Sequence, residues 1–260
     1  MLYEPLSRHK IRQYLDVETG DIHLFDELAS TNTWLLEQGA CGDICLSEQQ
    51  TAGKGRRGNS WVSPDAGNIY FSMCWCFEEM TEYWSLLGLV VGVAVAETLD
   101  QVGLSNHGIK WPNDIFWDER KLGGILLESQ DQSGRVVIGV GLNIGLDSTM
   151  KITEEISQSW VSLKDALGHY GVISRNLIVA KLINNLHRKL VGFADFDADR
   201  FIKAWQKWDV LSGRKVYFLH QGEKIIGEVQ GIDKYGRIAI YQGKGVTEYY
   251  SSADVKLLRL

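Results

Sequence analysis

A short glycine-rich segment carries the densest positive charge in the sequence. Residues 53–58 have the sequence GKGRRG, so one lysine and two arginines stand between three glycines. Cationic side chains neutralise phosphate groups, and glycines give a loop the backbone freedom to close over a ligand. The segment therefore predicts a flexible loop that binds a polyanion. Taken alone, it is also compatible with an ordinary solvated surface turn.

The spacing of these glycines matches the G-x-G-x-x-G pattern of dinucleotide-binding folds, but the following residues do not. A dinucleotide-binding loop leads directly into a helix, whose N-terminus holds the pyrophosphate. Here NSWVSPDAGNIYF follows, and Pro64 and Gly67 within it argue against a helix. The protein-kinase motifs H-R-D and D-F-G are absent, and no Lys-Ser/Thr completes a Walker A loop. The sequence thus excludes these three nucleotide-binding motifs.

Further short motifs have residue types suited to a polar or charged ligand. Residues 110–114 (KWPND) place a lysine before a rigid proline turn, where it can enter a pocket and neutralise charge on an oxygen. Residues 121–128 (KLGGILLE) and 139–143 (GVGLN) set glycines within apolar strands, which marks a bulge or a ligand pressed against backbone. Residues 30–32 (STN) are polar and also typical of a helix N-cap. Taken alone, residues 110–114 are equally compatible with an ordinary surface turn and with a lysine that enters a pocket.

The segments around these motifs predict an α/β (α+β) fold with a mixed sheet. Helices are expected after Ser7 as far as Leu15, from Ser30 to Gln38, and at 84–101, 175–193 and 199–208. Strands are expected at 21–28, 43–46, 68–77, 109–111, 115–117, 124–128 and 135–146. The last fifty residues contain four short strands separated by glycine turns, which predicts a small β-barrel. We therefore expect two domains, 1–209 and 210–260.

Composition restricts the partners that the chain can attract. It has 27 Lys+Arg against 33 Asp+Glu, a net charge of −6, so it has no global attraction to nucleic acid or anionic lipid. An anion site must therefore be a local island of positive charge. The most apolar run, residues 86–96, is shorter than the ~20 residues that cross a bilayer. We expect a buried core helix there, no membrane contact and, without a signal peptide, a cytoplasmic protein.

The four cysteines at positions 41, 45, 74 and 76 form no Cys-x-x-Cys pair. That pattern favours neither a zinc site nor a thioredoxin-like redox site. We expect all four to be reduced thiols of the core.

Taken together and in this order, the motifs resemble those of the biotin–protein ligase family. The family pattern runs Ser-Thr-Asn, Gln-x-x-Gly-[Arg/Lys]-Gly-Arg-x-Gly-x-x-Trp, Lys-Trp-Pro-Asn-Asp, Lys-[Leu/Val]-x-Gly-Ile-Leu-x-Glu and Gly-x-Gly-x-Asn, and residues 30–143 have a counterpart of each. The C-terminal segment is similar to the family's small SH3-like β-barrel. Lys54 stands where many members have arginine, which loses bidentate geometry at that position. Gly123 stands where many have alanine.

The resemblance implies a role for each matched residue. The biotin-binding residues would be Ser30, Thr31, Asn32, Gln50, Lys54, Gly55, Arg56, Lys110 and Gly124. The ATP-binding residues would be Arg57, Trp61, Asn113, Lys121 and Asn143, with the Trp61 indole stacked on adenine. Lys110 and Arg56 would be the catalytic groups. No protein ligand to a metal is assigned, and Mg²⁺ is expected as the partner of the phosphates.

The same resemblance implies a two-step reaction. Biotin and ATP would form biotinyl-5'-AMP, and biotin would then pass to a lysine of biotin carboxyl carrier protein, a subunit of acetyl-CoA carboxylase. Only 29 residues precede Ser30, so we expect no winged helix-turn-helix domain and no direct DNA binding. The sequence leaves open a monomer or a homodimer.

Two alternative functions differ in what they require of the sequence. A lipoate–protein ligase of the same superfamily would have Arg-Arg before a run of glycines followed by His-Asp, and this loop has neither. A non-catalytic sensor or repressor that binds biotinyl-AMP is the second alternative. The missing DNA-binding domain argues against it, and an assay for turnover distinguishes it from an enzyme.

Overall fold

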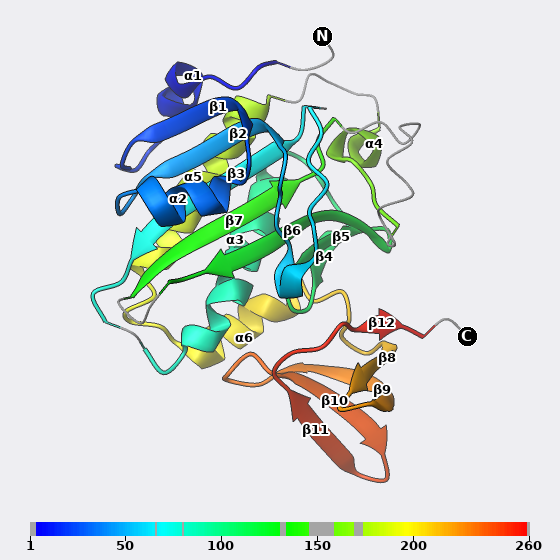
Figure 1. The fold of residues 1–260 in the computed structure, drawn as a ribbon. Helices are drawn as coiled ribbons and strands as arrows, with labels where there is room; N and C mark the ends of the chain where they lie inside the picture. Colours follow the sequence, from blue (N-terminus) through cyan, green and yellow to red (C-terminus); the bar gives the residue numbers. More distant parts are fainter. Residues whose placement is uncertain are drawn as a thin grey trace.

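Two β-sheets organise the chain, as Figure 1 shows. The structure, a computed structural model, describes residues 4–65, 67–79, 81–130, 134–145, 159–168 and 174–258. A mixed sheet of seven strands comes first, and a five-stranded antiparallel sheet follows it in the chain. This architecture matches the predicted fold class.

The seven-stranded sheet has the order β1-β2-β3-β7-β6-β5-β4. Its strands are β1 (Ile22–Leu28), β2 (Ile44–Gln50), β3 (Ile69–Cys76), β4 (His107–Lys110), β5 (Asp114–Trp117), β6 (Arg120–Glu128) and β7 (Arg135–Leu142). Strands β1 and β2 pair in parallel and the other neighbours are antiparallel, so the sheet is mixed. The glycines of 121–128 and 139–143 lie on β6 and β7 at the centre of this order.

Helices cover both faces of this sheet. In Figure 1, α2 (Thr31–Gln38) lies in front, while α3 (Leu87–Gln101) and α5 (Arg175–Val191) lie behind. Helix α1 (Arg8–Gln13) contacts α5, and α6 (Ala198–Gln206) precedes the second sheet. A short α4 (Leu163–Leu167) and a 3₁₀ turn, Trp84–Leu86, complete the helices outside the glycine-rich loop in the described part of the chain.

Helix α3 forms the centre of the hydrophobic core. Eleven of its fifteen residues are buried. Among the described residues, Trp84–Gln101 is the one helix that is long and apolar enough to cross a membrane, but 67% of it is buried inside the structure. An all-round apolar helix with such burial is a core helix, as the sequence predicted.

The five-stranded sheet has the order β11-β10-β9-β8-β12. Its strands are β8 (Lys215–His220), β9 (Glu223–Ile232), β10 (Ile238–Gly243), β11 (Val246–Tyr250) and β12 (Lys256–Leu257). The four strands expected in this segment are present, and β12 was not predicted. The boundary expected between residues 209 and 210 falls in the connection from α6 to β8, and the division into two domains stays a prediction.

That connection is hydrogen-bonded to the edge of the seven-stranded sheet. The amide of Ile109 on β4 donates to the Trp208 carbonyl at 2.6 Å, and the Val210 amide donates to the Ile109 carbonyl at 3.2 Å. Trp111, just after β4, donates from Nε1 to the Gly236 carbonyl at 2.9 Å. Because Lys110 stands between these two anchors, the C-terminal sheet is fixed beside the KWPND turn.

The elements differ from the expected ones mainly at their ends. Strand β2 extends to Gln50 and β6 begins at Arg120, both beyond the predicted bounds. The strand expected at 135–146 ends at Leu142, because the Ile144 amide donates to the Asn68 side chain at 2.9 Å instead of to a strand. Residue 146 lies outside the described residues.

The expectation of four reduced core thiols is wrong for two of the cysteines. Cys41 and Cys76 form a disulfide, with their Cα atoms 5.6 Å apart. The antiparallel pairing of Ile44 with Met73 brings the residues before β2 to the end of β3, a contact that 35 residues of separation conceal. Cys45 and Cys74 are buried and free, and burial raises the pKa of Cys45 to about 12.

Candidate active site

A pocket of about 260 Å³ lies over the centre of the seven-stranded sheet. Its walls come from the start of α2, the end of β2, the glycine-rich loop, the turn between β4 and β5, the glycine positions of β6 and β7, and residues 253–255. The structure places thirteen of the fourteen predicted site residues in its lining: Ser30, Thr31, Asn32, Gln50, Lys54, Gly55, Arg56, Arg57, Trp61, Lys110, Asn113, Lys121 and Gly124.

The start of α2 forms a neutral, hydrogen-bonding end of the pocket. Ser30 caps the helix by accepting from the Thr33 amide, so the N-cap and the pocket wall are the same residue. Gln50 Oε1 accepts from the Thr31 amide at 2.9 Å and lies 3.2 Å from Thr31 Oγ1. Gln50 Nε2 donates to Ser63 Oγ at 2.9 Å, so its amide holds Thr31 in place.

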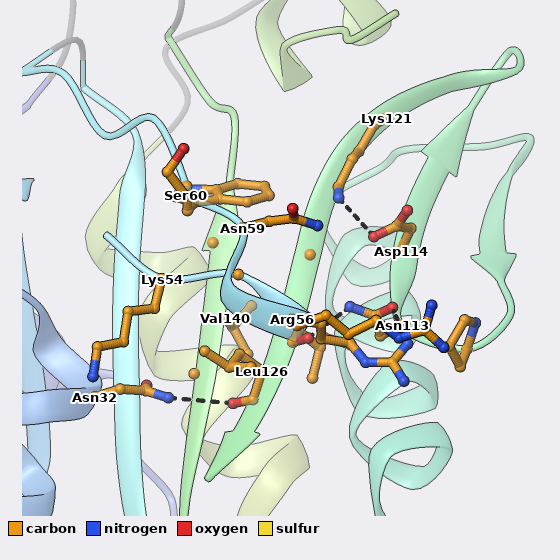
Figure 2. A pocket seen from close by; sticks show the side chains of 18 of the residues that line it. Asn32, Lys54, Arg56, Asn59, Ser60, Asn113, Asp114, Lys121, Leu126 and Val140 are labelled. Carbon is orange, nitrogen blue, oxygen red and sulfur yellow. Dashed lines mark hydrogen bonds and ion pairs between the residues drawn. The ribbon is translucent and has the colours of Figure 1, made fainter. Parts of the chain in front are cut away.

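Asn32 is turned from α2 toward β6, as Figure 2 shows. Its Nδ2 lies 3.4 Å from the Leu126 carbonyl oxygen, and its Oδ1 lies 2.5 Å from Ser72 Oγ. Ser72 Oγ is also 2.7 Å from Thr31 Oγ1. A Cβ at Gly139 would come within 2.3 Å of the Asn32 amide oxygen, so this approach requires glycine on β7.

The glycine-rich loop lies across the pocket and contacts two other walls. Residues Arg56–Gly58 form a 3₁₀ turn, and Arg57 within it has a positive φ of 57°. The Arg56 guanidinium donates to Asn113 Oδ1 at 3.0 Å (Figure 2). It also donates to Ser252 Oγ at 3.4 Å, and Arg57 donates to the same Ser252 oxygen. Burial, and then the neighbouring Arg57, lower the pKa of Arg56. An anion in the pocket relieves both effects.

The Trp61 indole lies against the backbone of the two central strands. A Cβ at Gly141 would stand 2.7 Å from Trp61 Cε2, and one at Gly124 would stand 2.9 Å from Cζ3. These glycines therefore make room for the ring. Trp61 Nε1 is buried and, within the part of the chain that the structure describes, has no hydrogen-bond partner. Lys121 Nζ lies 5.2 Å from the ring centroid.

Lys110 is the most buried cation of the pocket lining, with 8% of its surface exposed. Burial lowers the pKa of Lys110, and the Asp114 carboxylate partly offsets that shift. Asp114 also forms an ion pair with Lys121 at 2.7 Å. Asn113 is fixed from both sides, because its Nδ2 donates to the Ile125 carbonyl and its carbonyl accepts from the Ile125 amide.

Asn143 is the predicted site residue that does not line the pocket. It is buried, and its Nδ2 lies 3.4 Å from the carbonyl oxygens of Lys121 and Val161. The Leu163 amide donates to the Asn143 carbonyl at 2.7 Å. Asn143 thus joins β6 to the segment before α4. Its predicted role in binding ATP stays a prediction.

Several residues of this site had no role predicted from the sequence. Asp114 is part of the KWPND motif, so its presence in the site could have been predicted from that motif. Ser252 and Asp254 had no such signal, because they follow β11 in the other sheet, almost two hundred residues after the loop. Only the folded chain brings them to the pocket.

The charges around the pocket are strongly unbalanced. Among the described lining residues, five are cationic (Lys54, Arg56, Arg57, Lys110 and Lys121) and two are carboxylates (Asp114 and Asp254). The whole chain has a net charge of −6. The pocket is therefore the local island of positive charge that an anion site requires. In the described part of the chain, no cluster of three or more His, Cys, Asp or Glu side chains could hold a metal ion.

Comparisons with known proteins agree with this geometry. Residues 24–144 match the Biotin/lipoate A/B protein ligase family, and residues 211–258 match the Biotin protein ligase C terminal domain. The chain is 33% identical to the bifunctional ligase/repressor BirA of Escherichia coli, over 98% of this chain and 80% of that one. The chain belongs to the biotin protein ligase family.

Two further relatives extend the match. A biotin–[acetyl-CoA-carboxylase] ligase of Mycobacterium tuberculosis is 29% identical, over 99% of this chain and 98% of its own. A solved structure of the biotin protein ligase from Aquifex aeolicus in complex with biotin and ATP is 26% identical, has a TM-score of 0.79, and is matched over 92% of this chain and 99% of its own. The predicted family, fold class and ligase activity, with ATP and biotin as substrates, are confirmed.

Proposed function

We propose that this ligase activates biotin with ATP in the pocket over β6 and β7, and then transfers it to a lysine of a biotin carboxyl carrier protein. The observation that carries the proposal is the polarity of the pocket. Its end at α2 offers neutral donors and acceptors, while the rest of its lining has five cations. A cyclic urea suits the first part and the phosphates of a nucleotide suit the second.

The first step joins two anions. A carboxylate oxygen of biotin attacks the α-phosphorus of ATP, which enters as its magnesium complex. A bond forms between them, and the bond to the bridging oxygen of the β-phosphate breaks, which releases pyrophosphate. Lys110 and Arg56 offset the repulsion between the reactants and the charge of the transition state. Lys110 is buried, so water screens its charge weakly.

The second step needs no nucleophile from the ligase. The amine of the acceptor lysine attacks the carbonyl carbon of biotinyl-5'-AMP, an amide bond forms, and AMP leaves while the amine proton passes to solvent. Trp61 stacks on adenine, Arg57, Asn113 and Lys121 complete the lining of the nucleotide site, and Asn143 supports that site from beside the pocket. Ser30, Thr31, Asn32 and Gln50 bind the ureido ring, while Lys54, Gly55 and Gly124 line the rest of the biotin site. Transfer of biotin to a purified carrier domain, measured as a mass increase, tests the overall proposal.

The carrier that we propose is the biotin carboxyl carrier subunit of acetyl-CoA carboxylase, because the Mycobacterium tuberculosis relative is named for that substrate. The cytoplasmic location, the lack of direct DNA binding and of membrane contact, and the monomer or homodimer stay predictions.

We expect the glycine-rich loop to act as a lid that trypsin can detect. The loop lies across the pocket in the structure, but Lys54, Arg56 and Arg57 repel one another and three glycines make residues 53–58 flexible, so we expect it to open readily from this position when no ligand is bound. Biotin with ATP supplies the missing negative charge and orders the loop. Trypsin should therefore cut the free ligase after Lys54, Arg56 or Arg57, and both ligands together should protect these bonds.

The protection experiment includes its own control. Cleavage at other exposed lysines, such as Lys224 in the C-terminal sheet, should be the same with and without ligands. Equal cleavage of the loop in both states would show that residues 53–58 do not close over the substrates.

A further inference from the structure

Glu128 joins two parts of the site, although no role has been assigned to it. It is the last residue of β6 and of the KLGGILLE segment, and 28% of its side chain is exposed. Its Oε2 accepts a hydrogen bond from Asn32 Nδ2 at 2.9 Å. Its Oε1 lies 4.0 Å from Lys54 Nζ on the glycine-rich loop. One carboxylate thus contacts both the start of α2 and the loop.

The contact with Glu128 completes the hydrogen bonding of the Asn32 amide. Nδ2 has two hydrogens, and its two acceptors are Glu128 Oε2 and the Leu126 carbonyl. Asn32 Oδ1 receives the Ser72 hydroxyl. Because Asn32 is 4% exposed, loss of the carboxylate leaves a buried amide hydrogen without its acceptor and frees the amide to rotate. Ser72 has one hydroxyl hydrogen, so its donation to Asn32 leaves Ser72 Oγ to accept from the Thr31 hydroxyl, 2.7 Å away. The orientation of Asn32 therefore sets that of Ser72 and then of Thr31.

The contact between Glu128 and Lys54 anchors the end of the loop opposite to the end held by Arg56 and Arg57. Arg56 and Arg57 reach Asn113 and Ser252, on the far walls of the pocket. Lys54 extends in the opposite direction, toward Asn32, as Figure 2 shows. The loop is therefore held over the pocket from two sides, and Glu128 is the partner on the side of the biotin-binding residues.

We propose that Glu128 is a positioning residue that couples closure of the loop to recognition of biotin. One carboxylate oxygen fixes the Asn32 amide, and through Ser72 the Thr31 hydroxyl, while the other oxygen attracts Lys54. Loop closure and the ordered ureido site therefore favour each other. The inference rests on the proposed function, because it takes Asn32, Thr31 and Lys54 as parts of the biotin site.

Two substitutions at Glu128 separate its contacts. Glu128→Gln keeps an oxygen that can accept from Asn32 but removes the charge that attracts Lys54. Glu128→Ala removes both. A partly exposed ion pair contributes little, so we expect Glu128→Gln to raise the KM for biotin by about 2- to 5-fold. Loss of a hydrogen bond to a charged group has a larger effect, so Glu128→Ala should raise the KM for biotin by about tenfold or more. The kcat should change much less than the KM, since Glu128 touches no reacting atom.

A matched control and a double variant test the coupling. Glu97 pairs with Lys189 at 2.9 Å between α3 and α5, away from the pocket, so Glu97→Gln removes a similar charge and should leave the KM for biotin unchanged. Lys54→Gln removes the same ion pair together with the part that Lys54 itself takes in the biotin site, so the KM for biotin should rise at least as much as in Glu128→Gln. The double variant Lys54→Gln/Glu128→Gln should be no worse than Lys54→Gln alone, because the shared interaction is already lost.

The rates are measured by biotin-dependent ATP–pyrophosphate exchange, and thermal unfolding of each variant checks its folding. If Glu128→Ala is unstable, the isosteric Glu128→Gln and the double variant carry the test. Glu128 variants with the biotin KM of Glu97→Gln would overturn the inference, and so would additive effects in the double variant. If the unaltered ligase itself shows no exchange with biotin, the proposed function fails instead.

Discussion

Lys110→Ala is expected to lower the rate of biotin adenylation by about 10²-fold or more, as loss of one preorganised charge-stabilising group typically does. Lys110 lies in the pocket at the end of β4 and is buried there. Its ammonium group lies over the Phe116 ring and interacts with the carboxylates of Asp114 and Asp254. A charge in such a place acts on the α-phosphate with little screening. Transfer from supplied biotinyl-AMP should fall much less, because the phosphoryl charge has already been formed and bound.

The same burial predicts a pH dependence. Burial holds the pKa of Lys110 below its ordinary value of 10.5. Attraction to Asp114 and Asp254 raises this pKa in part, and repulsion from Lys121 and Lys256 lowers it further. Lys110 stabilises phosphate charge only as a cation, so kcat/KM for adenylation should fall as pH rises toward that lowered pKa. Lys110→Arg keeps the cation over the whole range and should remove this alkaline fall, while it lowers the rate through its different geometry.

Single-turnover formation of biotinyl-AMP measures the effect of Lys110→Ala, and Lys10→Ala on α1 is the matched control, because Lys10 lies outside the pocket lining. Adenylation by Lys110→Ala within twofold of the control would contradict a catalytic role for Lys110.

Biotin is expected to exceed lipoate and octanoate in kcat/KM by about 10⁴-fold, as sites built to hydrogen-bond a substrate discriminate against analogues that lack those groups. Thr31, Gln50 and Ser72 form an interlocked polar wall whose orientation is fixed without ligand contacts. An octanoyl chain would desolvate the remaining lone pairs of this wall and offer them no hydrogen-bond donor. The discrimination therefore comes as much from the free energy lost when the wrong acid desolvates this wall as from the hydrogen bonds gained with biotin.

Thr31→Val tests the origin of that discrimination. The substitution keeps the shape of the side chain but removes its hydroxyl, so kcat/KM for biotin should fall by about tenfold, which corresponds to one hydrogen bond. Activity with octanoate should not fall with it. Adenylate formation from each acid, followed by mass spectrometry, gives the ratios. A parallel loss for both acids would assign Thr31 a general structural role in α2.

The sequence predicted which segments line the pocket better than it predicted the bounds of the elements. The loop at 53–58 and the KWPND turn were recognisable because glycines, cations and proline restrict both conformation and chemistry, and both segments line the pocket. The glycines of 121–128 and 139–143 predicted a bulge or a ligand pressed against backbone, but nothing in the sequence indicated that the group against Gly124 and Gly141 is the indole of Trp61. Contacts between distant segments carry no such local signal.

Three results show what local patterns cannot predict. Ser252 meets Arg56 and Arg57 only because the C-terminal sheet is fixed to β4 and the following turn. The disulfide between Cys41 and Cys76 depends on the register of β2 and β3. Asn143 belongs to a motif of the site, yet its side chain faces two backbone carbonyls beside the pocket. Each outcome depends on tertiary pairing, which neither residue type nor spacing specifies.

The central claim is that this pocket adenylates biotin, and ATP–pyrophosphate exchange tests it most directly. The purified ligase is incubated with ATP, labelled pyrophosphate and biotin, lipoate or octanoate in separate reactions, with Lys110→Ala as the catalytic control. We expect rapid exchange with biotin, almost none with the other two acids or without an acid, and strongly reduced exchange by Lys110→Ala. Equal exchange with lipoate and biotin, or exchange that needs no acid, would contradict it.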